Sequence, residues 1–161
     1  MMNYTKKLKK QINKMNIAFH GKTLTYFSQL NNWQWIDSKA ALSLQENKLK
    51  QLLTHAYYHV PYYRSIFNKI GIIKNTSQIN LEMFQKLPFL DKNTIRQNFE
   101  ELKTNDIGKR KWHENASGGS TGEPLTFIQD STYADWREAI KILFDSWTGY
   151  SLSEKKVRLW G

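Results

Sequence analysis

The sequence contains no cysteine, and acidic residues are missing from its first 36 positions. The absence of cysteine excludes disulfides, thiolate metal sites, thiol nucleophiles and zinc-finger folds. No apolar stretch approaches the length of a membrane span, and the basic N-terminus is not followed by an uninterrupted apolar run of signal-peptide length. We therefore expect a soluble, cytoplasmic protein.

The formal net charge of +10 is concentrated near the N-terminus. No acidic residue precedes Asp37, whereas six lysines do: Lys6, Lys7, Lys9, Lys10, Lys14 and Lys22. Apolar residues recur among them at helical spacing: Tyr4, Leu8, Ile12 and Met15. Residues 1–22 therefore include a short basic amphipathic pattern that can contact an anionic membrane surface or nucleic acid phosphates. The alternative is a solvated helix that packs one narrow apolar stripe against its own domain, because runs of charged residues are usually solvent-exposed faces.

Between Glu46 and Tyr58 the sequence predicts one clear helix. Its apolar residues fall on one face, at i, i+3, i+4, i+7 and i+8: Leu49, Leu52, Leu53, Ala56 and Tyr57. Pro61 should end this helix, because proline disfavours the helical conformation for the residue before it. The earlier segment Thr23–Asp37 shows no period, and we expect it to be irregular or weakly helical.

Two shorter helices are predicted next. The first is Pro61–Ile70, which begins with a good first-turn residue and has Gly71 as its C-terminal stop. The second is Lys92–Glu101, because the carboxylate of Asp91 can accept the free N–H groups of its first turn. Residues 46–108 therefore predict a helical subdomain.

Beyond the basic turn at 109–111, the sequence predicts strands as well as helices. Trp112–Ala116 and Leu125–Gln129 are the predicted strands, and a Gly-rich loop separates them. His113 and Glu114 lie close enough to that loop to approach a substrate, but packing at the edge of the strand is the favoured role.

A longer helix capped by Asp130 or Ser131 should follow the second strand and stop at Gly149. Its apolar face is expected to pack in the core: Tyr133, Trp136, Ile140, Leu143, Phe144 and Trp147. Val157–Trp160 would then open another strand, which would complete a right-handed parallel β-α-β unit. The sequence therefore predicts an α/β fold, and its sheet would be incomplete at that point.

The loop 117–124, with the sequence SGGSTGEP, has the composition that most clearly suggests a ligand site. Its glycines let the backbone approach a ligand closely, and consecutive N–H groups in such a turn form a concave anion site. Hydroxyl side chains add further donors, so a polyphosphate is the expected ligand. The loop lacks the Gly-Lys-Ser/Thr ending of a Walker A motif. Composition alone would also allow a flexible surface turn.

This loop resembles the signature phosphate loop of the adenylate-forming superfamily, whose usual form is Ser-Gly-Thr/Ser-Thr-Gly-x-Pro, often followed by Lys. Other stretches are similar to phenylacetate–coenzyme A ligases and to their relatives in capsular polysaccharide biosynthesis. These stretches are LLTHAYYHVPYYRSIF, KLPFLDKNTIRQNFE, and the run from the loop through DWREAIKILF to KKVRLWG. The resemblance covers about Glu46 to Gly161.

The resemblance implies that the loop closes over the β- and γ-phosphates of ATP while a carboxylate attacks the α-phosphorus. Pyrophosphate would leave, and an acyl-adenylate would remain. The implied phosphate contacts are Ser117, Gly118, Gly119, Ser120, Thr121 and Gly122. ATP and magnesium are the implied cofactors, a small carboxylic acid is the implied substrate, and coenzyme A is a further candidate.

Two positions depart from the family pattern. Gly119 stands where Thr or Ser is commoner, and Leu125 follows Pro124 where many relatives have Lys. The missing lysine leaves one cation fewer near the γ-phosphate. The resemblance assigns no catalytic residue within this chain.

The family's adenine and ribose motifs, its magnesium-binding acid, its hinge and its C-terminal lysine domain would all lie beyond Gly161. We therefore expect the N-terminal part of an ATP-dependent, AMP-forming ligase, in which a helical N-terminal region leads into the start of the α/β domain. The expected divisions are a basic segment at 1–45, the helical subdomain at 46–108, and the nucleotide-binding start at 109–161. A separately encoded C-terminal portion is a candidate partner.

No acyl-adenylate formation is expected from the chain alone, because those motifs are needed to hold the nucleotide for reaction. ATP–pyrophosphate exchange in the presence of carboxylic acids measures this directly, and a measurable rate would contradict the expectation.

The competing function is a non-catalytic module that binds an anionic membrane or nucleic acid through its basic N-terminus, although nucleic acid is not the expected partner. Deleting residues 1–22 and measuring retention on liposomes or DNA separates the two, since only the binding module predicts a loss.

His55 and His59 have the spacing of a zincin metal pair, but no glutamate lies between them, so no metal site is predicted. They are expected to hydrogen-bond or stack among nearby tyrosines: Tyr57, Tyr58, Tyr62 and Tyr63. Arg64 and Arg96 are candidates for contact with a substrate phosphate or with coenzyme A, although solvated salt bridges are the commoner role.

Overall fold

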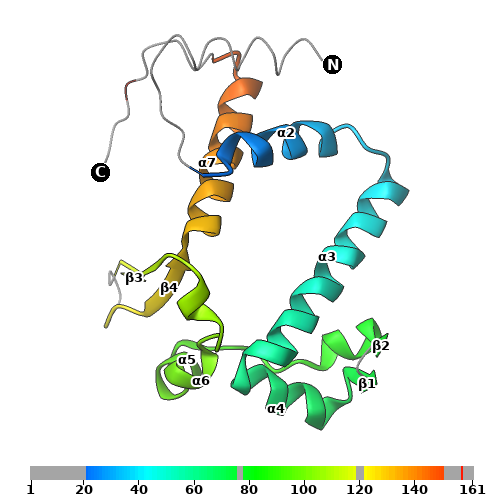
Figure 1. Cartoon of the computed structure of the whole chain (residues 1–161), viewed down its shortest axis with the longest axis vertical. Coiled ribbons are helices and arrows are strands. Elements are labelled where there is room, and N and C mark those ends of the chain that lie inside the picture. Colours follow the sequence, from blue (N-terminus) through cyan, green and yellow to red (C-terminus); the bar gives the residue numbers. More distant parts are fainter. Residues whose placement is uncertain (1–20, 76–77, 119–121, 151–156, 158–161) are drawn as a thin grey trace. The chain divides into compact units, whose positions relative to one another are not determined.

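The computed structural model of the chain describes residues 21–75, 78–118, 122–150 and 157 (Figure 1). These residues fall into two compact units. Unit 1 is formed by the described parts of Met1–Ile36 and Ser131–Gly161, and unit 2 is Asp37–Asp130. The boundaries predicted after residues 45 and 108 stay predictions. The described chain is mostly helical and contains small antiparallel sheets, so it combines helices and strands as expected.

Unit 1 is a pair of helices, α2 (Thr23–Trp33) and α7 (Ser131–Trp147), which pack against each other (Figure 1). Its buried apolar side chains come from both helices: Phe27, Ala139, Ile142 and Leu143. Trp136 of α7 stacks on Tyr26 of α2, with ring centroids 4.1 Å apart. The two helices therefore bury a shared apolar stripe, which is how most helices in proteins gain their stability.

The helix α2 lies in the segment Thr23–Asp37, for which the sequence leaves irregular and weakly helical structure open, and the helical alternative is confirmed over Thr23–Trp33. Its N-terminal cap comes from α7 rather than from its own sequence. The carboxylate of Asp135 accepts a hydrogen bond from the Lys22 N–H at 2.9 Å and another from the Thr23 hydroxyl at 3.0 Å. These bonds satisfy groups at the start of the helix that would otherwise need water.

Only part of the apolar face predicted for α7 is buried. Leu143 is buried as predicted, but four other members of that face are exposed: Tyr133, Ile140, Phe144 and Trp147. The prediction that Phe144 and Trp147 lie in the core is therefore wrong, since they are 52% and 62% exposed. The indole N–H of Trp147 instead donates to the Gln34 side chain at 2.8 Å.

Unit 2 begins with α3 (Ser38–His59) and α4 (Pro61–Ile70). The sequence predicts the end of α3 and both ends of α4 correctly, and Gly71 ends α4 with a φ of +70°. The helix α3 starts earlier than predicted, because the Asp37 carboxylate accepts the Ala40 N–H at 2.8 Å and caps it there.

Arg64 of α4 binds the end of α3. Its Nε donates to the carbonyl of Tyr57 at 2.9 Å, and a terminal guanidinium nitrogen donates to the carbonyl of Tyr58. These carbonyls belong to the last turn of α3, where no further helical N–H can reach them. Arg64 therefore fixes the corner between the two helices.

The core of unit 2 forms where α3 and α4 meet a small hairpin. Three side chains are buried there: Leu53, Phe67 and Ile72. The hairpin consists of β1 (Ile73–Asn75) and β2 (Gln78–Ile79), which pair antiparallel. A 3-10 helix, η1 (Leu81–Lys86), follows, and its Leu81 and Met83 pack against the same core.

The predicted helix Lys92–Glu101 is interrupted. Asp91 caps α5 (Lys92–Gln97) as predicted, by accepting the Thr94 N–H at 2.7 Å. Asn98 then ends α5, because its side-chain amide donates to the Thr94 carbonyl at 2.8 Å and competes with helical continuation. A single turn, α6 (Phe99–Leu102), and a 3-10 turn, η2 (Ile107–Lys109), complete this region.

Replacing Asp91 with alanine is expected to lower the melting temperature near neutral pH and to have little effect in strong acid. The Thr94 N–H lowers the pKa of the Asp91 carboxyl group, so the charged form stabilises the fold. That contribution is complete above the unfolded pKa of about 4 and is lost as the pH falls through the lower pKa of the folded state. Thermal unfolding at about pH 7 and at about pH 2 measures the difference.

Asp91→Asn is the matched control, because an asparagine side chain can still accept the Thr94 N–H. An effect of Asp91→Ala that is equally large at both pH values would contradict the assigned role of the carboxylate.

The last strands of the described chain form a hairpin of β3 (Trp112–Ala116) and β4 (Thr126–Asp130). The strands pair antiparallel, with Ala116 opposite Thr126 and Trp112 opposite Asp130. The first strand has the predicted bounds, and the second is shifted by one residue. Asp130 is the last residue of β4, and α7 begins at Ser131. The predicted strand at Val157–Trp160, and with it the parallel β-α-β unit, lies outside the described residues apart from Val157.

Among the residues that the structure describes, no helix combines the length and apolar character needed to cross a membrane. The basic segment 1–20 lies outside those residues, so its predicted amphipathic helix stays a prediction.

Candidate functional site

The Gly-rich loop is carried by the β3–β4 hairpin, and Ser117 closes its base. The Ser117 N–H donates to the Leu125 carbonyl at 2.9 Å, and the Leu125 N–H donates to the Ser117 hydroxyl oxygen at 2.9 Å. Ser117 thus binds the opposite side of the loop with both its backbone and its side chain. The segment between these residues is anchored at both ends by an antiparallel ladder.

Three predicted phosphate contacts lie within the described part of the loop. These are Ser117, which is partly buried, and Gly118 and Gly122, which are exposed. Gly122 has a φ of +148°, a backbone conformation that residues with a Cβ disfavour. Within the described part of the chain, and apart from the adjacent residues, no atom lies within 4 Å of where a Cβ would be at Gly118 or Gly122. Gly119, Ser120 and Thr121 lie outside the described residues.

Arg96 brings a positive charge to the far end of this loop. From α5, its guanidinium donates to the Glu123 carbonyl at 2.8 Å, and it lies 4.0 Å from the Glu123 carboxylate. The sequence identifies Arg96 only as one of two arginines that could meet a phosphate. The fold places it beside the loop, whereas Arg64 is engaged with the end of α3.

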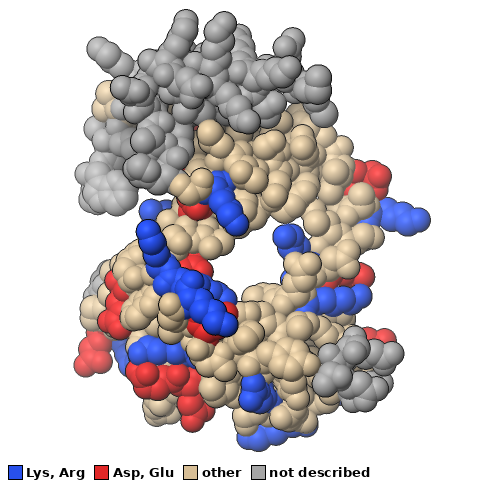
Figure 2. Space-filling view, viewed as in Figure 1, with Lys and Arg blue, Asp and Glu red and all other residues tan. Residues whose placement is uncertain are grey.

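Charge around the loop is mixed rather than uniformly basic. Figure 2 shows basic and acidic side chains next to one another over the region of α5, α6 and the β3–β4 hairpin. Pairs in this region include Lys103 with Glu100 at 2.7 Å and Arg110 with Asp106 at 2.9 Å. An anion at the loop would therefore depend on local donors and Arg96 more than on a broad positive field.

His113 and Glu114 lie on β3 and are exposed. They form cross-strand pairs with Gln129 and Ile128. Every residue of β3 is exposed. The predicted packing role of His113 and Glu114 therefore stays a prediction.

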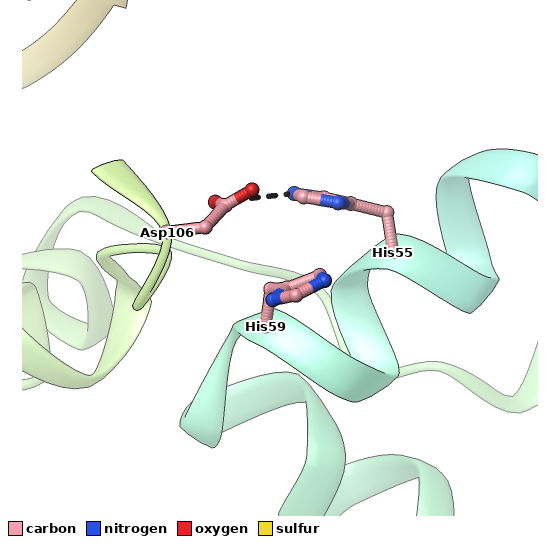
Figure 3. A group of neighbouring side chains, drawn as sticks. All are labelled: His55, His59 and Asp106. Carbon is pink, nitrogen blue, oxygen red and sulfur yellow. Dashed lines mark ion pairs between the residues drawn. The ribbon is translucent and has the colours of Figure 1, made fainter. Parts of the chain in front are cut away.

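A cluster of titratable side chains lies at the C-terminal end of α3. His55 and His59 face Asp106, which comes from the turn after α6 (Figure 3). The two imidazole rings have their centroids 4.7 Å apart, and His55 Nε2 lies 4.0 Å from a carboxylate oxygen of Asp106. One nitrogen or oxygen from each of the three side chains lies within 4.8 Å of the others.

Residues 104–110 supply contacts to both histidines that the sequence did not predict, and the predicted contacts with Tyr57, Tyr58, Tyr62 and Tyr63 stay a prediction. His59 Nδ1 lies 2.8 Å from the Asn105 side-chain oxygen, and the Asn105 N–H donates to the His59 carbonyl at 2.8 Å. Arg110 reaches His55 Nε2 at 3.3 Å and Asp106 at 2.9 Å.

Two pKa values reflect this packing. The Thr104 hydroxyl donates to Asp106, and together with Arg110 it lowers the pKa of that carboxyl group to about 2. Burial lowers the pKa of His55, and it outweighs the opposing effect of the Asp106 charge. Asp106 is therefore charged and His55 mainly neutral near pH 7.

Sequence reasoning did not connect Asp106 or Arg110 with the histidine pair. They follow His55 by 51 and 55 positions, and only the return of the chain through α5 and α6 brings them together. The available signal was the His-x-x-x-His spacing itself, which places both rings on one face of a helix.

A comparison with protein-family models, with curated proteins and with solved structures found no match to this chain.

Proposed function

We propose that this chain is the N-terminal part of an ATP-dependent, AMP-forming carboxylate ligase, and that its loop 117–124 binds the phosphate tail of ATP. The observation that carries the proposal is the SGGSTGEP sequence at the turn of a hairpin whose base is closed by Ser117. The implied chemistry is the activation of a carboxylic acid as an acyl-adenylate, in which Mg²⁺ would neutralise part of the phosphate charge.

The described part of the loop has features that suit an anion. Gly118 and Gly122 are exposed, and among the described residues no atom other than those of adjacent residues lies within 4 Å of where their Cβ would be. Backbone N–H groups in a glycine-rich turn bind phosphate without a dedicated side chain. Nucleotidyl transfer needs such positioned donors more than it needs a protein nucleophile.

Arg96 offers a reason why Leu125 can stand where many family members have lysine. Its guanidinium is held beside the loop by the Glu123 carbonyl and does not depend on the residue after Pro124. Arginine keeps its charge at all relevant pH values and presents several donors in a plane, which suits phosphate oxygens. A cation from α5 would then replace a cation from the loop.

Binding of nucleotides to the chain tests this proposal. Titration calorimetry with MgATP, pyrophosphate and AMP should show that the first two bind and that AMP binds much more weakly, because the loop would contact the β- and γ-phosphates. Arg96→Gln should weaken MgATP binding by about tenfold, the loss expected for one hydrogen bond to a charged group.

Arg137→Gln is the matched control, since Arg137 is an exposed arginine of α7 and its loss changes the net charge equally. Equal binding of AMP and ATP, or equal effects of Arg96→Gln and Arg137→Gln, would refute a phosphate-tail site at this loop.

A further inference from the structure

We propose that His55, His59 and Asp106 form a binding site for a divalent transition-metal ion of the Zn²⁺ class. The site lies at the C-terminal end of α3 and uses no residue of the loop 117–124. The inference is therefore independent of the proposed nucleotide function.

The fold brings the three ligands together from two separate segments. His55 and His59 are one helical turn apart on α3, and their rings lie on the same face. Asp106 approaches this face from the turn that joins α6 to η2, as Figure 3 shows. All three residues are partly buried, and the side chain of Asp106 is only 16% exposed.

The donor set suits zinc and related ions. Imidazole nitrogens and a carboxylate oxygen are common zinc ligands, and a three-residue site leaves a position for water or a substrate. Two ligand atoms on one tetrahedral zinc ion lie about 3.3 Å apart. The candidate ligand atoms lie within 4.8 Å of one another, so modest rotations of the side chains would bring them into range.

Residues next to the proposed ligands form hydrogen bonds of the kind that orient ligands in metal sites. Asn105 places its side-chain oxygen 2.8 Å from His59 Nδ1, and Thr104 donates a hydrogen bond to the Asp106 carboxylate. Such outer partners orient metal ligands and hold the rings in place. These contacts would limit the movement of His59 and Asp106.

Arg110 already places a cation against two of the three ligands. Its guanidinium lies 3.3 Å from His55 Nε2 and 2.9 Å from an oxygen of Asp106. The same side chain lies 3.6 Å from the carboxylate of Asp130, at the end of β4. A metal ion would compete with Arg110 for Asp106 and His55, and Asp130 would keep a carboxylate next to the displaced guanidinium.

Calorimetric titration of ZnCl₂ into the full chain, without a histidine tag, tests the site. Wild type should bind one ion per chain, and His55→Ala and His59→Ala should each weaken binding by at least about tenfold. His113→Ala is the matched control, because His113 is exposed on β3, and it should bind as wild type does. Arg110→Gln should bind Zn²⁺ more tightly than wild type, since it removes the competing cation.

A measurement on wild type alone covers the case in which a histidine variant does not fold. The chain has four histidines, and Zn²⁺ should shift the imidazole NMR signals of His55 and His59 but not those of His20 and His113. Absence of saturable binding, equal loss in His113→Ala, or shifts confined to His20 and His113 would overturn the proposal. Unchanged affinity in Arg110→Gln would overturn the competition with arginine.

Discussion

Replacing Phe67 with alanine is expected to lower the free energy of unfolding of unit 2 by about 3–5 kcal/mol. Phe67 is 1% exposed and packs with Leu53 and Ile72 where α3, α4 and the β1–β2 hairpin meet. The loss combines the transfer of a large ring from water with the cavity left behind. It is a large share of the stability of a typical domain, which is about 5–15 kcal/mol. Urea unfolding followed by circular dichroism measures it.

Phe89→Ala is the matched control for this substitution. The Phe89 side chain is 101% exposed, so its removal should change the free energy of unfolding by no more than about 0.5 kcal/mol. Similar effects of the two phenylalanine substitutions would contradict the core assigned to unit 2.

Replacing Gly21 with alanine should destabilise the α2–α7 pair by about 2 kcal/mol or more. Gly21 has a φ of +81°, and a left-handed conformation alone costs a residue with a Cβ about 1–2 kcal/mol. An added Cβ would also lie 2.4 Å from a carboxylate oxygen of Asp135. That carboxylate cannot move away without losing its bonds to Lys22 and Thr23. Thermal unfolding of the variant measures the combined effect.

A double-mutant cycle with Asp135→Ala separates the two causes. In the Asp135→Ala background the clash is gone, so Gly21→Ala should cost only the left-handed strain of about 1–2 kcal/mol. An equal cost in both backgrounds would show that Asp135 does not restrict position 21.

The sequence predicts correctly those helices and strands whose ends are determined by residues at or next to the ends themselves. The end of α3, the whole of α4 and the first strand of the loop hairpin were predicted correctly, because Pro61, Gly71 and the Gly-rich loop act on the adjacent backbone. It leaves open those whose ends depend on distant residues. The helix α2 owes its cap to Asp135, which is 112 positions after Thr23, and no local pattern could reveal that bond.

The same distinction applies to the sites. The loop 117–124 can be identified from the sequence because its glycines and hydroxyl residues all lie in one short segment. The sequence predicts no metal at the histidine pair because no glutamate lies between the two residues. Asp106 and Arg110 could not be connected with the pair, since α4, the β1–β2 hairpin, η1, α5 and α6 lie between them in the chain. The position of Arg96 beside Glu123 also follows from the fold, since 27 residues separate the two.

The length of α3 has a thermodynamic consequence. Its last turns pack into the core of unit 2 at Leu53, but almost every side chain from Ser38 to Lys50 is exposed. That first half has little buried surface to hold it and relies on good helix formers and on the Asp37 cap. Isolated helices of this length are only marginally stable in water. On heating, the N-terminal half of α3 should therefore unwind gradually. The C-terminal end, which carries His55 and His59, should stay folded until the core of unit 2 unfolds.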